Sequence, residues 1–309
     1  MQPFSPARLL AVKEIPTGRS WLYEPKFDGY RGLLVSGAGG RGSVWSRNGK
    51  DLGRYFPELV DLAARLPADT VIDGEIVRPI ETGVSFIQLQ RRLMTPIKEL
   101  RSTAREWPAA FVAFDLMRWV EDLRPLKLSE RRARLEGLVA KQGDSLLQLM
   151  LQTSNVDTAA AWLDDGLSIA GIEGVVAKLN EPYPKPEARR WRKVRRMLTR
   201  EFAVQGFIPE GQKSMRLVLA VDDDGESRIV GTTYPIAGDD AAPVLSLIPR
   251  AAVSDRRIWA PFEDGRHDAW FQVPAGLVAE VVITNLDSNL LRQPARFVRW
   301  RLTEPSPLL

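Results

Sequence analysis

The sequence predicts a mixed α+β protein of two domains, residues 1–198 and 199–309. Its 309 residues are enough for two separate hydrophobic cores. The first two thirds of the chain alternate apolar, strand-like runs with stretches of helical periodicity. After about Thr199, short β-rich segments separated by turn residues predominate, which favours a small β-barrel as the second domain.

Composition excludes several classes of protein and of site. Hydrophobic residues make up 44% of the chain and charged residues 27%, as in ordinary soluble proteins. No apolar run is long enough to span a bilayer, and no signal peptide is visible, so we expect a cytoplasmic protein without membrane contact. With no cysteine and a single histidine, His267, any metal should be held by carboxylates, which favours Mg²⁺ or Mn²⁺.

The net charge of +4 and the pI of about 9.4 are compatible with a polyanionic partner. The densest basic runs, 189–196 and 292–301, are interleaved with tryptophan and phenylalanine, a combination typical of nucleic-acid binding. An excess of arginine also follows from high genomic GC content, so charge alone decides little.

The first elements are read from prolines, glycines and alternation. Prolines predict an irregular lead-in over residues 1–20, followed by a short strand at 21–23 that leads to Lys26. Residues 37–42 match the dinucleotide-binding pattern G-x-G-x-x-G, but that pattern must open a helix. Here a strand-like run, 43–46, follows instead, so the glycines predict a hairpin loop and not a Rossmann fold.

Periodicity and turn residues place the remaining elements. Helices are expected from Pro57, around Ser85 to Leu93, from a Ser129 cap to about Val139, and from an Asp157 cap to Asp165. Strands are expected at 71–77, 111–116, 171–178 and 191–195, and in the second domain at 202–208, 215–221, 227–233, 278–283 and 297–302. A turn at Asp222 to Gly225 joins two of the latter, and an OB-fold is the natural interpretation of this β-rich region.

One stretch combines residue types suited to covalent catalysis. Lys26 precedes Asp28 by two residues, Gly29 allows the chain to turn, and Arg31 is placed to meet a phosphate. In an extended segment Lys26 and Asp28 point to the same side. A lysine becomes a nucleophile when neighbouring cations or desolvation keep its amine neutral. A surface hairpin with an Asp-Gly turn and solvated charges is the alternative.

Further charges interrupt apolar strands. Asp73 and Glu75 are costly in a buried strand unless they are paired or bound to a ligand. Glu173 and Lys178 face opposite ways unless a bend intervenes, whereas alternation puts Lys193 and Arg195 on one face. Taken in chain order, the charged motifs are Lys26-x-Asp28-Gly29-x-Arg31, Ser46-Arg47-Asn48-Gly49, Asp73-Gly74-Glu75, Phe114-Asp115, Glu173-Gly174-Val175-Val176-Ala177-Lys178 and Trp191-x-Lys193-x-Arg195.

This ordered set resembles the covalent nucleotidyltransferases, and among them the ATP-dependent DNA ligases. The closest likeness is to bacterial stand-alone ligases and to the ligase module of end-joining ligases, and it covers nearly the whole chain. It implies an ATP-grasp-like nucleotidyltransferase (adenylation) domain followed by an OB-fold domain. It also implies three steps: Lys26 takes AMP from ATP, AMP passes to a DNA 5′-phosphate, and a 3′-hydroxyl displaces it.

The resemblance also implies roles for individual residues. Lys26, Asp28, Lys178 and Lys193 are expected to act directly in the reaction. Glu75 is expected on the ribose hydroxyl, Phe114 on the adenine ring, and Glu75 with Glu173 on the metal. Three cations are expected at the α-phosphate, where they disfavour the charged form of the lysine: Lys178, Lys193 and Arg195. Further nucleotide contacts are expected from Glu24, Arg31, Arg47 and Arg301.

Two departures from the family pattern stand out. Arg195 stands where many relatives have lysine, and arginine keeps the charge but not the compact geometry. The C-terminal motif Arg-x-Asp-Lys is matched only at Arg301, because Thr303 and Glu304 replace its last two residues. That motif orients the leaving pyrophosphate in the family, so slower self-adenylylation is expected.

Three alternatives stay open: an RNA ligase, a GTP-using capping-type enzyme, and a non-catalytic protein that binds nicked DNA. An NAD⁺-dependent ligase is disfavoured because neither an extra N-terminal domain nor zinc-binding cysteines are present. The expected partner is nicked or broken duplex DNA, bound by a nucleoid-associated monomer that acts in repair, with end-joining proteins on separate chains as further partners.

Overall fold

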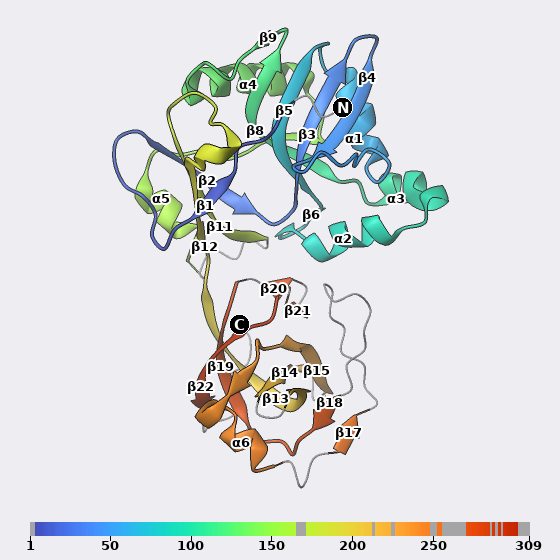
Figure 1. Cartoon of the computed structure of the whole chain (residues 1–309). Helices are drawn as coiled ribbons and strands as arrows, with labels where there is room; N and C mark the ends of the chain where they lie inside the picture. The colour runs from blue at the N-terminus through green and yellow to red at the C-terminus, as the bar shows by residue number, and fades with distance from the viewer. Residues whose placement is uncertain are drawn as a thin grey trace. The chain divides into compact units, whose positions relative to one another are not determined.

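The computed structural model describes residues 4–164, 171–211, 214–223, 226–247, 252–254, 270–284, 286–287, 290–291 and 293–301. The chain divides into two compact units, Met1–Arg196 and Met197–Leu309, which are described separately (Figure 1). Both helices and strands are present, so the predicted mixed α+β class is confirmed. Among the described residues, no helix combines the length and the apolar character required to cross a bilayer.

Unit 1 contains two main sheets. The first has the strand order β1-β12-β11-β2, formed by β1 (Leu9–Ala11), β2 (Trp21–Phe27), β11 (Ile172–Leu179) and β12 (Trp191–Arg195). The lead-in was expected to be irregular, and this was wrong for β1, which pairs in parallel with β12. A three-residue strand carries too short a pattern to be recognised, because its long-range partner and not its own sequence stabilises it.

The second sheet has the order β10-β8-β5-β3-β4, with β9 paired to β8. Its strands are β3 (Tyr30–Gly37), β4 (Arg41–Ser46), β5 (Thr70–Val77), β8 (Ala110–Trp119), β9 (Glu121–Asp122) and β10 (Leu147–Leu149). The glycine-rich loop joins β3 to β4 as a hairpin, with Gly37 opposite Arg41, which confirms the interpretation of that loop. A two-stranded hairpin, β6 (Pro79–Ile80) and β7 (Gly83–Val84), follows β5.

The helices of unit 1 are α1 (Pro57–Arg65), α2 (Phe86–Met94), α3 (Leu100–Glu106), α4 (Leu128–Gln142) and α5 (Val156–Ala161), with short 3₁₀ turns η1 (Ile97–Glu99) and η2 (Pro186–Ala188). Two predicted caps were wrong. Ser129 lies inside the first turn of α4, where its N–H donates to Asn180. Asn155, one residue before α5 begins, accepts from the N–H groups of Asp157 and Thr158 and is the cap. The helix ends at Ala161, and Asp165 lies outside the described residues.

Apolar residues cover both faces of the second sheet. Ile72 and Ile76 of β5 pack into the core under α1, α2 and α4. Val71 and Val77, on the opposite face of the same strand, pack into the core shared with Trp191 of the first sheet. Strand alternation therefore directs Asp73 and Glu75 between the two sheets.

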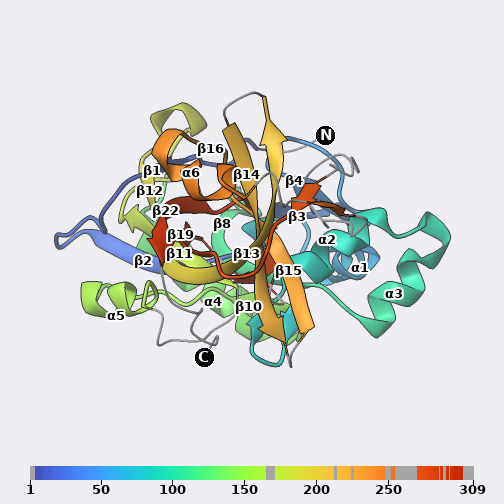
Figure 2. The ribbon, with the colours of Figure 1, turned by 90° about the horizontal axis from the view of Figure 1, so that it is seen from below.

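Unit 2 is rich in strands, and its main sheet has the path β15-β14-β13-β18-β17, with β19 joining β13 to β22. The strands are β13 (Leu198–Glu210), β14 (Ser214–Asp223), β15 (Glu226–Thr232), β16 (Ile236–Ala237), β17 (Ala252–Ser254), β18 (Trp270–Gln272), β19 (Val278–Ile283), β20 (Leu286–Asp287), β21 (Leu290–Leu291) and β22 (Arg296–Arg301), with η3 (Gly238–Asp240) and α6 (Ala242–Leu245). β14 and β15 pair up to Asp223 and Glu226, which confirms a hairpin at the predicted turn. Figure 2 shows the two units from below.

Candidate active site

Lys26 stands near the end of β2, opposite Gly174 of β11. The strand ends at Phe27, and the buried Asp28 follows with its N–H donating to the Gly171 carbonyl at 2.8 Å. Gly29 then lets the chain reverse into β3, since a Cβ there would lie 2.3 Å from the Ile76 carbonyl oxygen. The expected turn at this glycine is confirmed, and the turn brings β2 and β3 to two different sheets.

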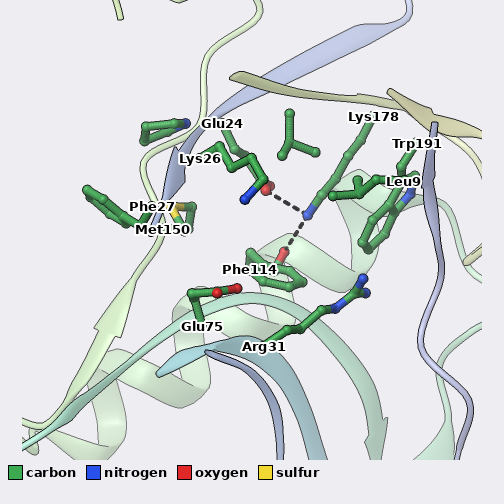
Figure 3. Close-up of a pocket in the computed structure, with 12 residues that line it drawn as sticks. Leu9, Glu24, Lys26, Phe27, Arg31, Glu75, Phe114, Met150, Lys178 and Trp191 are labelled. Atoms are coloured by element: carbon green, nitrogen blue, oxygen red, sulfur yellow. Dashed lines mark hydrogen bonds and ion pairs between the residues drawn. The ribbon is translucent and has the colours of Figure 1, made fainter. Parts of the chain in front are cut away.

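A pocket with an empty volume of about 400 Å³ lies beside Lys26 (Figure 3). The two sheets of unit 1 both contribute to its lining. The first sheet supplies Leu9, Glu24, Lys26, Val176, Lys178 and Trp191. The second supplies Arg31, Glu75 and Phe114. Six residues singled out in the sequence therefore meet at one pocket: Glu24, Lys26, Arg31, Glu75, Phe114 and Lys178.

The Lys26 amine donates to Glu173, and each side chain keeps 19% of its surface exposed. β11 has a register irregularity between Ile172 and Gly174, which is the bend needed to turn Glu173 toward Lys26. Glycine is required at position 174 because a Cβ would lie 2.1 Å from the Val194 carbonyl oxygen of β12. The close packing of three strands thus holds the lysine and the glutamate together.

Lys178 and Glu24 form a buried ion pair at 2.6 Å, with side-chain exposures of 1% and 3%. The Lys178 amine also lies 4.2 Å from the ring centroids of both Phe114 and Trp191. Burial raises the pKa of Glu24, and the positive charge of Lys178 opposes that rise. Gln152 donates to the same carboxylate at 2.8 Å, a contact that the sequence did not indicate. Lys178, which was expected at the α-phosphate, thus contacts Glu24 and the rings of Phe114 and Trp191.

Arg31 lines the pocket and is held in place by Asp73. Its guanidinium makes a bidentate pair with Asp73, at 3.0 and 2.7 Å, and its central carbon lies 5.4 and 5.3 Å from the ring centroids of Phe114 and Trp191. The Tyr183 hydroxyl donates to Asp73 at 2.6 Å. This pairing explains how a carboxylate is tolerated in the buried strand β5. The sequence singled out Asp73, because a carboxylate in a buried strand is unfavourable without a partner. It gave no sign of Tyr183, which is a single tyrosine in a proline-rich loop.

Glu75 faces Arg31 across the β3–β5 ladder. Burial raises the pKa of Glu75 to about 7, against the lowering effect of the Lys26 and Arg31 charges. The carboxylates of Glu173 and Asp73 add to the rise. Glu75 is therefore a carboxylate in a crowded, largely desolvated position at the pocket.

Lys193 is close enough to other cations for their charges to act on it. Partial burial lowers the pKa of Lys193, and the charges of Arg195 and Lys26 lower it further. Glu173 opposes this effect, and Arg47, which follows β4, adds to it weakly. The alternation of β12 thus places Lys193 near Lys26, with the exposed Arg195 beside it.

Comparison with known proteins decides the family. The family model described as "ATP dependent DNA ligase domain" matches residues 8–195, which is more than half of the chain. The chain belongs to the ATP-dependent DNA ligase family. The resemblance drawn from the ordered motifs is thereby confirmed.

Named relatives of this ligase extend over almost its full length. It is 37% identical to DNA ligase C2 of Mycolicibacterium smegmatis, over 97% of this chain and 91% of that protein. It is 30% identical to DNA ligase C of Mycobacterium tuberculosis, over 97% and 90%. Among solved structures, mycobacterial DNA ligase D complexed with ATP and MES is 25% identical, with a TM-score of 0.53 and coverage of 97% and 96%.

The residues described for this ligase contain no group of three or more Asp, Glu, His or Cys side chains suited to a metal ion. Two of the expected carboxylates, Glu75 and Glu173, nevertheless interact electrostatically beside Lys26. A Mg²⁺ ion bound together with substrate phosphates needs only one or two carboxylates from the protein. The donor set therefore fits a metal that is completed by the nucleotide.

Arg301 belongs to unit 2, at the end of β22. Its guanidinium pairs with Glu201 at 2.9 Å and with Glu280, and Glu280 also accepts from Arg299 at 3.1 Å. Thr303 and Glu304, where the ligase departs from the family motif, lie outside the described residues.

Proposed function

We propose that this ligase joins a 5′-phosphate to a 3′-hydroxyl at nicks or breaks in duplex DNA through a covalent AMP on Lys26. The observation that carries the assignment is the position of Lys26: near the end of β2, in the lining of the two-sheet pocket, paired with Glu173 and close enough to Lys193 for their charges to interact. A lysine flanked by other cations beside a nucleotide-sized pocket suits nucleophilic catalysis.

In the first step the Lys26 amine attacks the α-phosphorus of ATP. A nitrogen–phosphorus bond forms, the bond to the pyrophosphate oxygen breaks, and the amine gives up a proton. Charge then develops on the phosphate oxygens, and its stabilisation is assigned to Lys193 and Arg195, whose charges act on each other near Lys26. Arg47 is assigned to the same phosphates. AMP then passes to the DNA 5′-phosphate, and the 3′-hydroxyl displaces it.

The pocket walls are assigned to the nucleoside. Phe114 and Trp191 offer aromatic faces to adenine, and Lys178 with Glu24 supplies polar groups between those faces. Glu75 is assigned to a ribose hydroxyl. Arg31, whose guanidinium is committed to Asp73, is assigned to holding this wall in shape.

A Mg²⁺ or Mn²⁺ ion would be held by Glu173 and Glu75 together with ATP phosphates. When bound, such an ion neutralises charge on the phosphates during transfer. Burial is the main cause of the raised pKa of Glu75, and the charge of Glu173 adds to it. A desolvated carboxylate beside a second carboxylate gains from a bound cation, which supports this assignment. Asp28, buried at the turn, is assigned to positioning the metal or the DNA 3′ end.

Unit 1 is assigned to adenylation and unit 2 to an OB-fold that grips DNA, with the boundary at residues 196–198. Arg301 is assigned to orienting the pyrophosphate. Multifunctional non-homologous end joining protein LigD of Pseudomonas aeruginosa is 32% identical over 66% of this chain and 24% of its own length. That likeness supports a role in DNA repair, by a monomer that acts with end-joining proteins on other chains.

Intact-mass measurement tests the assignment. The full chain is incubated with Mg²⁺ and either ATP or GTP, alongside Lys26→Ala and a control, Lys185→Ala, which changes an exposed lysine. We expect an AMP adduct in the wild type and the control, and none in Lys26→Ala. An adduct that persists in Lys26→Ala moves the nucleophile elsewhere, and a GMP adduct refutes the ATP assignment.

A further inference from the structure

A second pocket of unit 1, with an empty volume of about 290 Å³, lies beyond the end of β5. Its polar lining comes from the segment after β5 and from two helices: Arg78, Gln88, Arg91, Arg92, Thr95 and Thr103. No residue of this lining belongs to the nucleotide pocket. α2 and α3, which supply most of it, lie side by side at one edge of unit 1 in Figures 1 and 2.

The backbone fixes how these side chains converge. The Ser85 N–H, at the start of α2, donates to the Arg78 carbonyl at 2.9 Å and so ties the helix to the end of β5. Gln88, Arg92 and Thr95 follow at intervals of three to four residues and share one face of α2 and its C-terminal cap. The pocket is therefore built on regular elements and not on a loose loop.

Three arginines and no carboxylate line this pocket. Arg92 is the only one of the three with a recorded ion pair among the described residues, donating to Glu58 at 2.9 Å. The Nε of Arg78 is buried without a hydrogen-bond partner in the described part of the chain. Burial lowers the pKa of Arg78, and the charge of Arg92 lowers it further. Arg92 is already committed, because it also donates to the carbonyls of Tyr55 and Trp107. Arg78 donates through Nη1 to the Pro79 carbonyl at 2.5 Å, so its Nε is the donor that an anion in the pocket would satisfy.

We propose that Arg78 and Arg91 form a binding site for a phosphate group, separate from the nucleotide pocket, with Arg92 held beside them by Glu58. Arginine is suited to this ligand because its fork of donors matches two phosphate oxygens at once. Gln88 adds a neutral donor, whereas the hydroxyls of Thr95 and Thr103 already donate to the carbonyls of Arg91 and Glu99.

The occupant we assign is a backbone phosphate of the DNA duplex. The chain belongs to a DNA ligase family, so duplex DNA is the phosphate polymer that it meets. Arg78 lies one residue beyond the end of β5 and three residues after Glu75, at most about 10 Å along the chain. The site thus extends the contact with DNA beyond the reacting phosphates. A free phosphate or pyrophosphate has the same chemistry, and the experiment separates these sources.

The first arm measures binding of the full chain to a nicked duplex whose 3′ end lacks the hydroxyl, without ATP, between about 50 and 200 mM salt. We expect Arg78→Gln to weaken binding and to reduce the slope of log K against log salt by about 0.9, the value for one phosphate contact. Because Arg78 and Arg91 bind the same phosphate, the double variant Arg78→Gln/Arg91→Gln should reduce the slope of log K against log salt no further than Arg78→Gln alone. Arg105→Gln removes an exposed arginine of α3 outside the pocket and should leave the slope unchanged.

The second arm adds inorganic phosphate, or pyrophosphate, to the protein without DNA and follows its melting temperature. Stabilisation of the wild type that is lost in Arg78→Gln, with an unchanged salt slope, identifies free phosphate as the occupant. If Arg78→Gln folds poorly, Arg91→Gln, which changes an exposed residue, gives the same readouts. The proposal is overturned if neither readout changes. AMP-adduct formation is measured separately, so a failure of the Lys26 assignment stays distinguishable.

Discussion

Replacing Glu75 by glutamine should increase the stability of unit 1 above neutral pH while reducing its activity. The pKa of Glu75 is raised from 4.5 to about 7, chiefly by burial. The folded protein therefore holds the Glu75 proton more tightly than the unfolded chain does. This stabilising contribution is complete below pH 4.5 and is lost as the pH rises through about 7.

The size of the effect follows from the same values. A difference of about 2.5 between the two pKa values, at about 1.4 kcal/mol per pH unit, corresponds to about 3 kcal/mol of unfolding free energy. Glutamine keeps the shape of the side chain but does not ionise. The variant should therefore gain about 3 kcal/mol relative to the wild type between pH 4.5 and pH 8.

Urea unfolding followed by tryptophan fluorescence measures this difference across the pH range. The protein is first treated with pyrophosphate, which reverses the first step and removes any bound AMP. Glu187→Gln, at an exposed position of η2, is the control and should show no such trend. A stability difference between Glu75→Gln and wild type that is flat with pH, or that falls as pH rises, refutes the reasoning. A gain in stability with a loss of AMP transfer is the expected pattern for a functional carboxylate.

The remaining predictions concern the strands around Lys26. Lys178→Met should cost about 3–5 kcal/mol because it leaves the Glu24 carboxylate buried without its partner, and adding Glu24→Gln should recover much of that loss in a urea double-mutant cycle. Gly174→Ala should lower both the stability of the protein and the rate of AMP transfer, because the added Cβ would meet the Val194 carbonyl. Gly137→Ala on α4 is the control: a Cβ there meets nothing, so the variant should be more stable by about 0.5–1 kcal/mol. Lys193→Arg should shift the alkaline limit of AMP transfer to higher pH, because the pKa of Lys193 lies below that of an ordinary lysine; an unchanged pH profile contradicts this.

Local patterns predicted the elements of unit 1 well where they were long enough. The helix from Pro57 and the strand that carries Asp73 and Glu75 both appear at the expected positions. These elements bury one stripe or one face, so their periodicity is written into a short stretch of sequence. β1 was missed because three residues contain less than two full alternations, and Asn155 was missed because several polar residues in that loop are equally suited to capping.

Six of the residues singled out in the sequence line one pocket, but their pairings were not predicted. Alternation within β11 is a local property, and it predicted that Glu173 and Lys178 face opposite ways unless a bend intervenes. The offset between β11 and β2 is not local, because it depends on the bulge before Gly174 and on packing against β12. With Glu24 opposite Val176, Lys178 becomes the diagonal neighbour of Glu24 and its amine reaches that carboxylate.

The same reasoning explains why the arginine pocket left no mark on the sequence. Arg78 follows a strand, and Arg91 and Arg92 lie near the end of a helix, where basic residues are ordinary and favourable to the helix dipole. Only the fold brings Arg78 into one pocket with the end of α2, and no carboxylate is among the described residues that line this pocket. A charge that is unremarkable in its own element becomes informative once its spatial neighbours are known. Arginines such as Arg78, which share a pocket with other cations and keep a donor without a partner among the described residues, are therefore the observations to follow when the sequence motifs of a ligase have already been assigned.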